Sequence, residues 1–340
     1  MQGLVTVFGG SGFVGGQVVR ALARKGSRIR VAVRQPGRGY RLRMLGDVGQ
    51  IEVVQANVRD APSIARALEG AEACVNLVAV LHEAGRQTFE ALHVEGARAV
   101  AAAARDVGVE RFVQVSAIGA AADSSALYGR TKAAGEAAVR ELLPSAVVLR
   151  PSIVFGPEDH FFNRFAQMAQ LSPALPLIGG GATRFQPVYV GDVGQAVANA
   201  VWDPAAAGRD FELGGPVVYT FKELMILLLA EINRRRLLVP VPFSAARLLG
   251  IAGDVMAMLP LPLAPPITSD QVELLRRDNV VSPGAAGLAD LGVAATALEP
   301  ILPTYLYRYL RGGQYAVDAQ SVAPPPLHAP SLHASGVTPT

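Results

Sequence analysis

Tyr128 and Lys132 are the two residues whose types and spacing most directly permit chemistry. They stand four positions apart at the start of a segment with helical character, so their side chains project from one face of the helix. A nearby ammonium group favours the phenolate form of a tyrosine, which can then exchange a proton with a substrate hydroxyl. We therefore predict Tyr128 as the acid and base, Lys132 as the group that tunes it, and Ser116 as the hydroxyl that polarises a carbonyl.

A glycine-rich segment near the N-terminus has the spacing of a phosphate-binding turn. Gly9, Gly12 and Gly15 lie between a short apolar run and a helical segment. The first permits a tight turn, the second lets the backbone approach a pyrophosphate, and the third lets helix and strand pack closely. Amides at the start of the helix then bind the phosphates. The sequence therefore predicts a dinucleotide site made by Gly9, Gly10, Ser11, Gly12, Phe13, Val14 and Gly15.

The end of the second apolar run indicates which dinucleotide is bound. An acidic residue there would bind the ribose 2′-hydroxyl and favour NAD. This chain has Arg34 at that place, with Arg38 close behind. A guanidinium can bind a 2′-phosphate through two charge-assisted hydrogen bonds, so NADPH is favoured over NADH; the alternative is that Arg34 is simply solvated. The other residues that we expect at the cofactor are Val58, Asp60, Asn76, Leu77, Val78, Ser116, Tyr128, Lys132, Pro151 and Ile153.

These residues need a scaffold, and the pattern of residues 1–150 predicts one. Short apolar runs alternate with longer segments rich in Ala, Arg and Glu, which indicates βαβ crossovers and a parallel sheet. Parallel strands are covered on both faces and so are almost continuously apolar. We predict an α/β fold with a doubly wound parallel sheet of the Rossmann type. The expected strands are 4–8, 28–34, 51–55, 74–80, 111–116 and 146–150, and the expected helices are 13–25, 89–106 and 127–142.

Residues 151–315 have a different texture, with many prolines and short elements. We expect a smaller, irregular α/β domain that packs over the carboxyl ends of the sheet, with some segments returning to the sheet. Its expected pieces are 161–170, 186–190, 193–202 and 220–233. Residues 316–340 are rich in Pro, Ala, Ser and His, and we expect a disordered tail.

Composition excludes several classes of protein. The chain has 340 residues, of which 51% are hydrophobic and 17% charged, so wholesale disorder is excluded. Cys74 is the only cysteine, which excludes a disulfide scaffold and fits a reducing compartment. No apolar stretch is long enough to span a bilayer, and no Lys/Arg run is dense enough for nucleic-acid binding. We predict no metal site, no signal peptide and a cytoplasmic location.

The motifs occur in an order that resembles a known family. The glycine turn, the Tyr128/Lys132 pair, and the segments 150–157 (RPSIVFGP) and 187–193 (PVYVGDV) are similar to the extended or atypical branch of the short-chain dehydrogenase/reductase superfamily. The resemblance covers roughly residues 3–235.

Residues 151–165 narrow this resemblance. They read Pro-Ser-x-x-Phe-Gly-x-Glu-Asp-x-Phe-x-Asn-x-Phe, which resembles the alpha-subcomplex subunit nine of respiratory complex I and its bacterial relatives. The resemblance implies a tightly held NADPH, complex I subunits as partners, and a stabilising role at the hydrophilic arm. It also implies a peripheral location on the cytoplasmic side of a bacterial inner membrane.

Other positions depart from the pattern of active members. Those members place a serine after the fifth strand, and here either Ser116 or Ala117 occupies that position. His93 stands where an asparagine is usual, and it either substitutes for that residue or is a satisfied interior histidine. Gly191 stands where an aspartate is common. We favour an accessory subunit without turnover, or with vestigial turnover. The alternatives are an active NADP-dependent oxidoreductase or nucleotide-sugar epimerase/dehydratase that uses Tyr128 and Lys132, and a redox-sensing regulator.

Residues 237–266 are unusually apolar and carry one further expectation. An amphipathic helix over 244–258 would place Leu248, Leu249, Ile251, Val255 and Met258 on one broad face. That face either contacts a membrane surface or a partner subunit, or it forms the ordinary core of the small domain.

Overall fold

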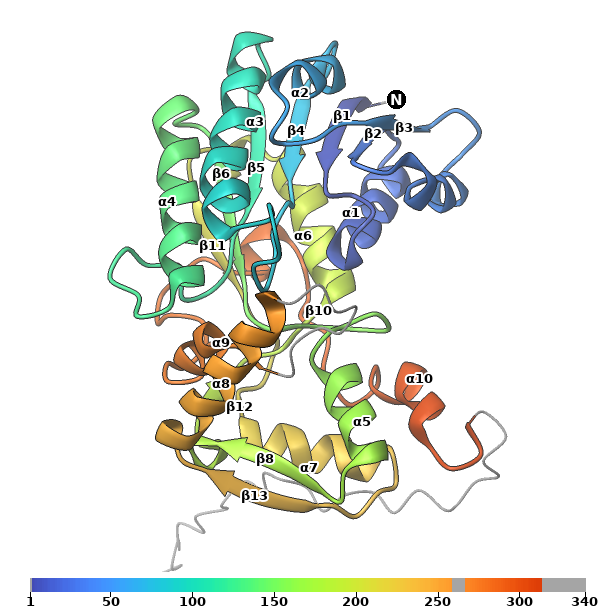
Figure 1. Cartoon of the computed structure of the whole chain (residues 1–340). Coiled ribbons are helices and arrows are strands. Elements are labelled where there is room, and N and C mark those ends of the chain that lie inside the picture. The colour runs from blue at the N-terminus through green and yellow to red at the C-terminus, as the bar shows by residue number, and fades with distance from the viewer. Residues whose placement is uncertain (1, 259–266, 314–340) are drawn as a thin grey trace, which may run out of the picture.

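Seven parallel strands form the centre of the computed structural model, which describes residues 2–258 and 267–313 (Figure 1). The strands are β1 (Gln2–Phe8), β2 (Ser27–Val33), β3 (Ile51–Gln55), β4 (Ala73–Asn76), β5 (Arg111–Val115), β6 (Val147–Pro151) and β11 (Asp210–Leu213). Their order across the sheet is β11-β6-β5-β4-β1-β2-β3, and every neighbouring pair is parallel. From the central neighbours β1 and β4, the chain adds β2 and β3 on one side and β5, β6 and β11 on the other. Ligands of such sheets bind at the carboxyl ends of the strands, at the point between β1 and β4 where the strand order reverses.

Helices cover both faces of this sheet. The helices α1 (Phe13–Arg24) and α6 (Val190–Trp202) share one apolar core with the sheet. The helices α2 (Ala61–Leu68), α3 (Glu95–Asp106) and α4 (Leu127–Leu142) share another core with it. In β1, Val5 and Val7 belong to the first core and Phe8 to the second. The predicted doubly wound α/β fold is thus confirmed, and burial on both faces explains the apolar runs.

Apart from α6 and β11, most of the second half of the chain forms an irregular layer below the carboxyl ends of the strands (Figure 1). Its helices are α5 (Phe162–Leu171), α7 (Phe221–Glu231), α8 (Phe243–Met258), α9 (Ser269–Leu274) and α10 (Pro303–Leu306). Its strands form three pairs: β7 (Val154–Phe155) with β10 (Val188–Tyr189), β9 (Arg184–Phe185) with β12 (Tyr219–Thr220), and β8 (Ala174–Ile178) with β13 (Leu237–Val241). Phenylalanine rings from α5, β9 and α7 meet in the core of this layer.

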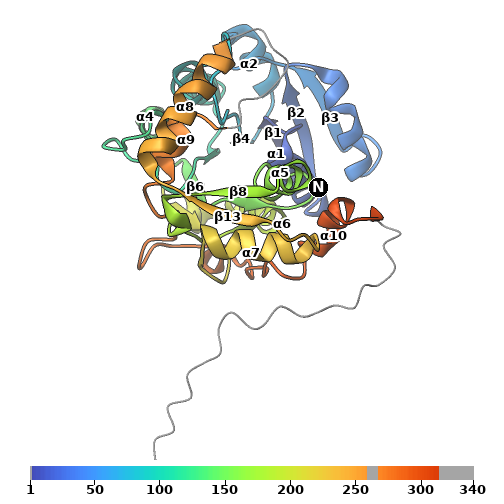
Figure 2. The ribbon, with the colours of Figure 1, turned by 60° about the horizontal axis from the view of Figure 1, so that its bottom comes forward.

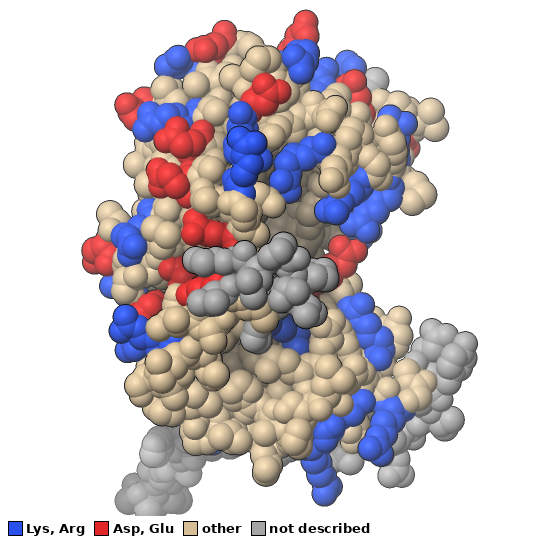
Figure 3. Space-filling model, viewed as in Figure 1, with Lys and Arg blue, Asp and Glu red and all other residues tan. Residues whose placement is uncertain are grey.

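The β8–β13 pair runs across the bottom of the molecule (Figure 2). The surface over these two strands is largely without charged side chains, whereas Lys, Arg, Asp and Glu gather over the upper half (Figure 3). Leu237 in β13 and Leu248 in α8 are 71% and 70% exposed. The layer therefore presents an apolar outer face.

Several predicted elements differ in extent. The expected strand over 74–80 ends at Asn76, because its neighbours β1 and β5 end in the same register. The expected helix over 89–106 is a π-helix, Glu90–Val94, followed by α3. The expected strand over 186–190 is only β10, and α6 begins directly after it. Short 3-10 helices cover Pro36–Arg38, Tyr40–Leu45, Gly179–Gly181, Pro204–Ala206, Ala289–Leu291 and Tyr307–Tyr309.

The helix expected over 244–258 is observed as α8. The side chains of Val255 and Met258, the segment 259–266 and the tail 316–340 lie outside the described residues.

Candidate functional site

The glycine turn joins β1 to α1 at the carboxyl edge of the sheet. Gly9 has φ +80°, a conformation that favours glycine, and its carbonyl accepts a hydrogen bond from the Gly12 amide at 3.1 Å. A Cβ on Gly15 would lie 2.4 Å from the Gly9 carbonyl oxygen, so only glycine allows this close approach. No side chain caps α1, and its first turn holds no acidic residue. The first amides of the helix therefore remain available to a phosphate.

A cavity of about 250 Å³ lies beside this turn. Arg34, at the end of β2, is exposed and lines it. Other predicted cofactor residues that line this cavity are Gly9, Ser11, Gly12, Val58, Leu77 and Val78. The cavity is thus walled by residues from the glycine turn and from the ends of β2 and β4, and its position suits the adenosine half of a dinucleotide.

Four predicted cofactor residues line neither this cavity nor the larger one described below: Gly10, Gly15, Asp60 and Asn76. Asp60 is exposed at the start of α2. Asn76 is buried, donates to the Gln114 side chain at 2.9 Å and accepts from the Val78 amide at 3.2 Å. Asn76 thereby links the ends of β4 and β5.

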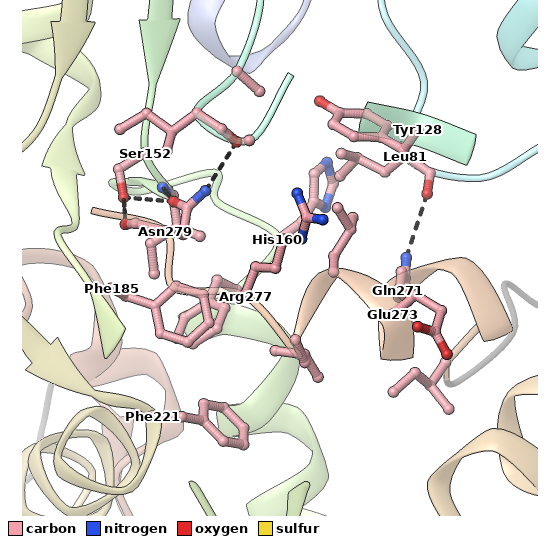
Figure 4. A pocket seen from close by; sticks show the side chains of 18 of the residues that line it. Leu81, Tyr128, Ser152, His160, Phe185, Phe221, Gln271, Glu273, Arg277 and Asn279 are labelled. Carbon is pink, nitrogen blue, oxygen red and sulfur yellow. Dashed lines mark hydrogen bonds between the residues drawn. The ribbon is translucent and has the colours of Figure 1, made fainter. Parts of the chain in front are cut away.

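Figure 4 shows part of a larger cavity of about 820 Å³. It adjoins the first cavity, because Leu77 and Ala79 line both. Residues that the sequence places far apart meet here: Phe13, Val14, Ser116, Tyr128, Lys132, Pro151 and Ile153. The two cavities together run along the carboxyl edge of the sheet, which is where an extended dinucleotide lies in folds of this type. The structure therefore brings the predicted catalytic residues into one place.

Lys132 is buried and points back toward the sheet. Its Nζ donates to the Val115 carbonyl oxygen at 3.0 Å. Burial lowers the pKa of Lys132 to about 8, although the Glu136 carboxylate opposes this shift. The ammonium is thus held at the end of β5, beside the position of Ser116.

Tyr128 is partly exposed at the cavity wall, and its surroundings favour the phenol form. Burial and the Asp270 carboxylate raise the pKa of Tyr128 to about 12. Asp270 accepts hydrogen bonds from the amides of Leu127 at 2.5 Å and Tyr128 at 3.1 Å, and so caps α4, where Ala126 offers no side-chain cap. The shift is opposite in direction to the one that a neighbouring ammonium alone would cause.

Ser116 and Ala117 both line the larger cavity, but they offer different groups to it. Ser116 is 5% exposed, and its Oγ is one of three buried side-chain polar atoms without a hydrogen-bond partner in the described part of the chain. A buried hydroxyl without a partner is costly and indicates a ligand group at this place. Ala117 presents only a methyl group.

His93 is a satisfied interior residue. The wide π-helical turn places its ring so that Nε2 accepts from the Val80 amide at 3.2 Å, while Nδ1 lies 3.1 Å from Thr131 Oγ1. Its ring lies edge-on to that of Tyr128, with centroids 5.3 Å apart. Burial and the nearby Lys132 charge lower the pKa of His93 to about 3, so it is neutral at pH 7.

Sequence reasoning missed the residues that the segment after α9 contributes. Asn279 accepts from Ser152 Oγ at 2.6 Å and from the Ile153 amide at 3.0 Å, and it donates to the Ile118 carbonyl at 3.1 Å (Figure 4). Arg277 lines the same cavity. No local pattern marks either residue, because their partners lie more than a hundred positions earlier in the chain.

Two absences hold for the described ranges. Residues 2–258 and 267–313 contain no group of three or more His, Cys, Asp or Glu side chains that could hold a metal ion. No helix within these ranges is both long and apolar enough to cross a bilayer.

The parallel sheet, the glycine turn and the two joined cavities define an NAD(P)-binding protein of the Rossmann type. The chain belongs to the NAD dependent epimerase/dehydratase family, whose sequence profile matches residues 5–214.

Relatives with curated names are similar over most of the chain. The mitochondrial NADH dehydrogenase [ubiquinone] 1 alpha subcomplex subunit 9 of Arabidopsis thaliana is 35% identical over 320 residues, covering 92% of this chain and 80% of that protein. The Mus musculus protein of the same name is 36% identical over 298 residues, covering 87% of this chain and 78% of that protein. The chain is thus homologous to complex I subunit 9. A ceramide reductase of Caulobacter vibrioides is 35% identical over 191 residues, covering 56% of this chain and 58% of that protein.

Solved structures share the fold at low identity. A triphenylmethane reductase of Citrobacter sp., complexed with NADP(H), has a TM-score of 0.69 and 21% identity, covering 88% of this chain and 99% of that one. MoeE5 in complex with UDP-glucose and NAD has a TM-score of 0.65 and 18% identity, covering 89% of this chain and 97% of that one. Such neighbours bind either dinucleotide, so the fold alone does not select between them.

Proposed function

We propose that this chain is an NADP(H)-binding accessory subunit of respiratory complex I that holds its cofactor with no turnover or only vestigial turnover. The observation that carries the proposal is similarity to subunit 9 proteins along 92% of this chain and 80% of one such relative. The glycine turn and the joined cavities supply the cofactor site.

The described residues offer groups for three parts of NADPH. Amides at the start of α1 would bind the pyrophosphate, Arg34 the 2′-phosphate, and Lys132 the nicotinamide ribose. Bound NADPH supplies a hydride donor. Proton transfer would fall to Tyr128, whose phenol form is favoured because burial and the Asp270 carboxylate raise its pKa.

The outer face of α8 and β13 supports a peripheral location at the cytoplasmic side of a bacterial inner membrane. Leu237, Leu248 and Ile251 are 71%, 70% and 47% exposed, and the exposed Arg235 lies two positions before Leu237. Apolar side chains with flanking cations suit the interface of an anionic membrane. In the same position, this face would also lie next to membrane-embedded subunits of the complex.

Affinity purification of the tagged full chain from gently solubilised native membranes tests the proposal. We expect complex I subunits to copurify and NADPH to be the nucleotide released on denaturation. A chain that migrates alone on native gels, or one that releases no pyridine dinucleotide, would contradict it.

A second candidate is an active NADP-dependent oxidoreductase. It is favoured by the meeting of Ser116, Tyr128 and Lys132 in one cavity, and the reductase name of the Caulobacter relative points the same way. Here Ser116 polarises the carbonyl and Tyr128 donates the proton. Substrate-dependent oxidation of bound NADPH that is lost in Tyr128→Phe, with cofactor affinity kept within about twofold, would establish this candidate over the first. A nucleotide-sugar epimerase or dehydratase would use the same pair.

A further inference from the structure

The larger cavity extends well beyond the residues that would face a cofactor. We call its far part the apolar lobe, which is lined by Phe165, Met168, Ile178, Phe185, Phe221 and Leu275. Phe185 and Phe221 are only 5% and 2% exposed, so this part is deep in the molecule (Figure 4). None of these side chains carries a charge or a strong hydrogen-bonding group. The lobe therefore suits hydrocarbon and disfavours the hydroxyls of a sugar, which would lose hydration without gaining partners.

The cavity carries positive charge nearer the surface. The Arg277 side chain is 53% exposed, and in Figure 4 its guanidinium lies between Tyr128 and the rings of Phe185 and Phe221. It forms an ion pair with Asp123 at 4.0 Å, and Asp123 is 85% exposed, so this pair is weak.

The acidic residues that line the cavity have arginine partners of their own. Asp278 pairs with Arg184 at 2.7 Å, and Glu273 pairs with Arg276 at 3.2 Å. These pairs neutralise the two carboxylates, so the cavity attracts an anion near Arg277.

One part of the cavity opening is apolar. Two leucines line the cavity and are also exposed to solvent: Leu249 in α8, which is 56% exposed, and Leu81, which is 52% exposed. A side chain that lines a cavity and faces solvent marks its rim. The adjacent Leu248 and nearby Ile251 lie on the outer face of the same helix, so the rim continues into the apolar surface. Leu249 therefore joins the cavity to the apolar outer face of α8.

We propose that this cavity binds a single-chain anionic lipid, with its hydrocarbon chain in the apolar lobe and its carboxylate or phosphate at Arg277. The volume of about 820 Å³ lies toward the upper end of the range for small-molecule sites, roughly 300–1,000 Å³, and so accommodates a chain in addition to a nicotinamide ring. Binding requires neither turnover nor membership of a larger complex, so this inference goes beyond the proposed function.

Displacement of a fluorescent fatty acid tests the proposal on the NADPH-loaded full chain in the absence of vesicles. Dansyl-labelled undecanoic acid is the probe, and palmitate, butyrate, cetyl alcohol and UDP-glucose are the competitors. We expect palmitate to displace the probe, cetyl alcohol to do so more weakly, and butyrate and UDP-glucose to fail. Displacement by UDP-glucose but not by palmitate would overturn the proposal.

Two neighbouring residues of α8 provide a matched pair of variants. Leu249→Glu places a negative charge at the rim and should weaken palmitate binding by about tenfold or more. Leu248→Glu adds the same charge to the outer face and should change it by less than about twofold. Both positions are exposed, so both variants should fold. Equal effects of the two substitutions would contradict the assigned site.

Arg277→Gln tests the head group separately. It should weaken palmitate by about fivefold or more while leaving cetyl alcohol nearly unchanged, because only the anion loses a charge-assisted partner. Equal losses for both competitors would contradict an anion site at Arg277.

NADPH affinity of each variant, measured by cofactor fluorescence, separates this inference from the proposed function. Retained NADPH without palmitate binding refutes the lipid site alone, whereas palmitate binding without any NADPH binding refutes the proposed function alone.

Discussion

Replacement of Arg34 by alanine isolates the interaction that selects NADPH. Arg34 lines the smaller cavity at the end of β2, beside Val33 and opposite the glycine turn. A hydrogen-bonded contact to a charged group contributes about 1.5–3 kcal/mol. Because Arg34 is exposed, solvent screening favours the lower end of this range. A loss of about 1.5 kcal/mol corresponds to a dissociation constant for NADPH that is about tenfold higher.

Titration calorimetry with both dinucleotides measures this effect on protein stripped of ligand. NADH has no 2′-phosphate, so its affinity should stay within about twofold in Arg34→Ala. Arg38→Ala is the matched control, because Arg38 is exposed in the same loop but does not line the cavity. The NADPH effect should also shrink as salt is added, since it is a contact between exposed charges. Equal losses for NADH and NADPH, or the larger loss in Arg38→Ala, would refute the reasoning.

Three further predictions concern stability. Gly15→Ala should lower the free energy of unfolding by roughly 1–3 kcal/mol, because the new Cβ would lie 2.4 Å from the Gly9 carbonyl oxygen. Gly16→Ala is the control and should leave stability unchanged, because its Cβ would meet nothing nearer than 3.9 Å. Thermal denaturation of the two variants compares them. Because the pKa of His93 is lowered in the folded state, the unfolded state binds the proton more tightly. The His93 contribution to stability is therefore full above about pH 6.5 and is lost as the pH falls toward 3. Urea denaturation at a series of pH values should show a shallower loss of stability with falling pH in His93→Asn. Glu136→Gln should cost roughly 1–3 kcal/mol in denaturant unfolding, because it breaks a 2.5 Å ion pair with the partly buried Arg150 guanidinium on β6, which keeps only Asp210, at 2.9 Å, as an ion-pair partner.

Each of these can fail in a defined way. Equal melting temperatures for the two glycine variants would mean that the turn relaxes around a Cβ. A pH profile that His93→Asn leaves unchanged would assign the acid sensitivity to other groups. A loss below about 1 kcal/mol for Glu136→Gln would show that solvent already screens the pair.

The sheet could be predicted from the sequence because its signals are local. Continuous apolar runs, the spacing of Gly9, Gly12 and Gly15, and the helical spacing of Tyr128 and Lys132 all act within a few residues. The meeting of these groups along the carboxyl edge follows from parallel topology. The assignment of individual site residues remains a prediction for experiment.

The parts that could not be predicted depend on contacts between distant segments. Asp270 caps α4 from 142 or more positions away, and its carboxylate adds to the rise in the Tyr128 pKa that burial causes. Asn279 binds Ser152 across 127 positions. The strand expected over 74–80 was too long, because the ends of neighbouring strands, rather than its own apolar residues, determine where pairing stops.

The stretch that carries Asp270 and Asn279 holds two separate parts of the cavity wall at once. Its carboxylate binds the amides of Leu127 and Tyr128, and its carboxamide binds the amide of Ile153. If this stretch lifts away as one cooperative unit, all three amides lose their acceptors in the same event. Deuterium uptake at these positions should then follow a common rate despite their distance along the chain, and that rate would set an upper limit on how fast a molecule enclosed behind the stretch can escape.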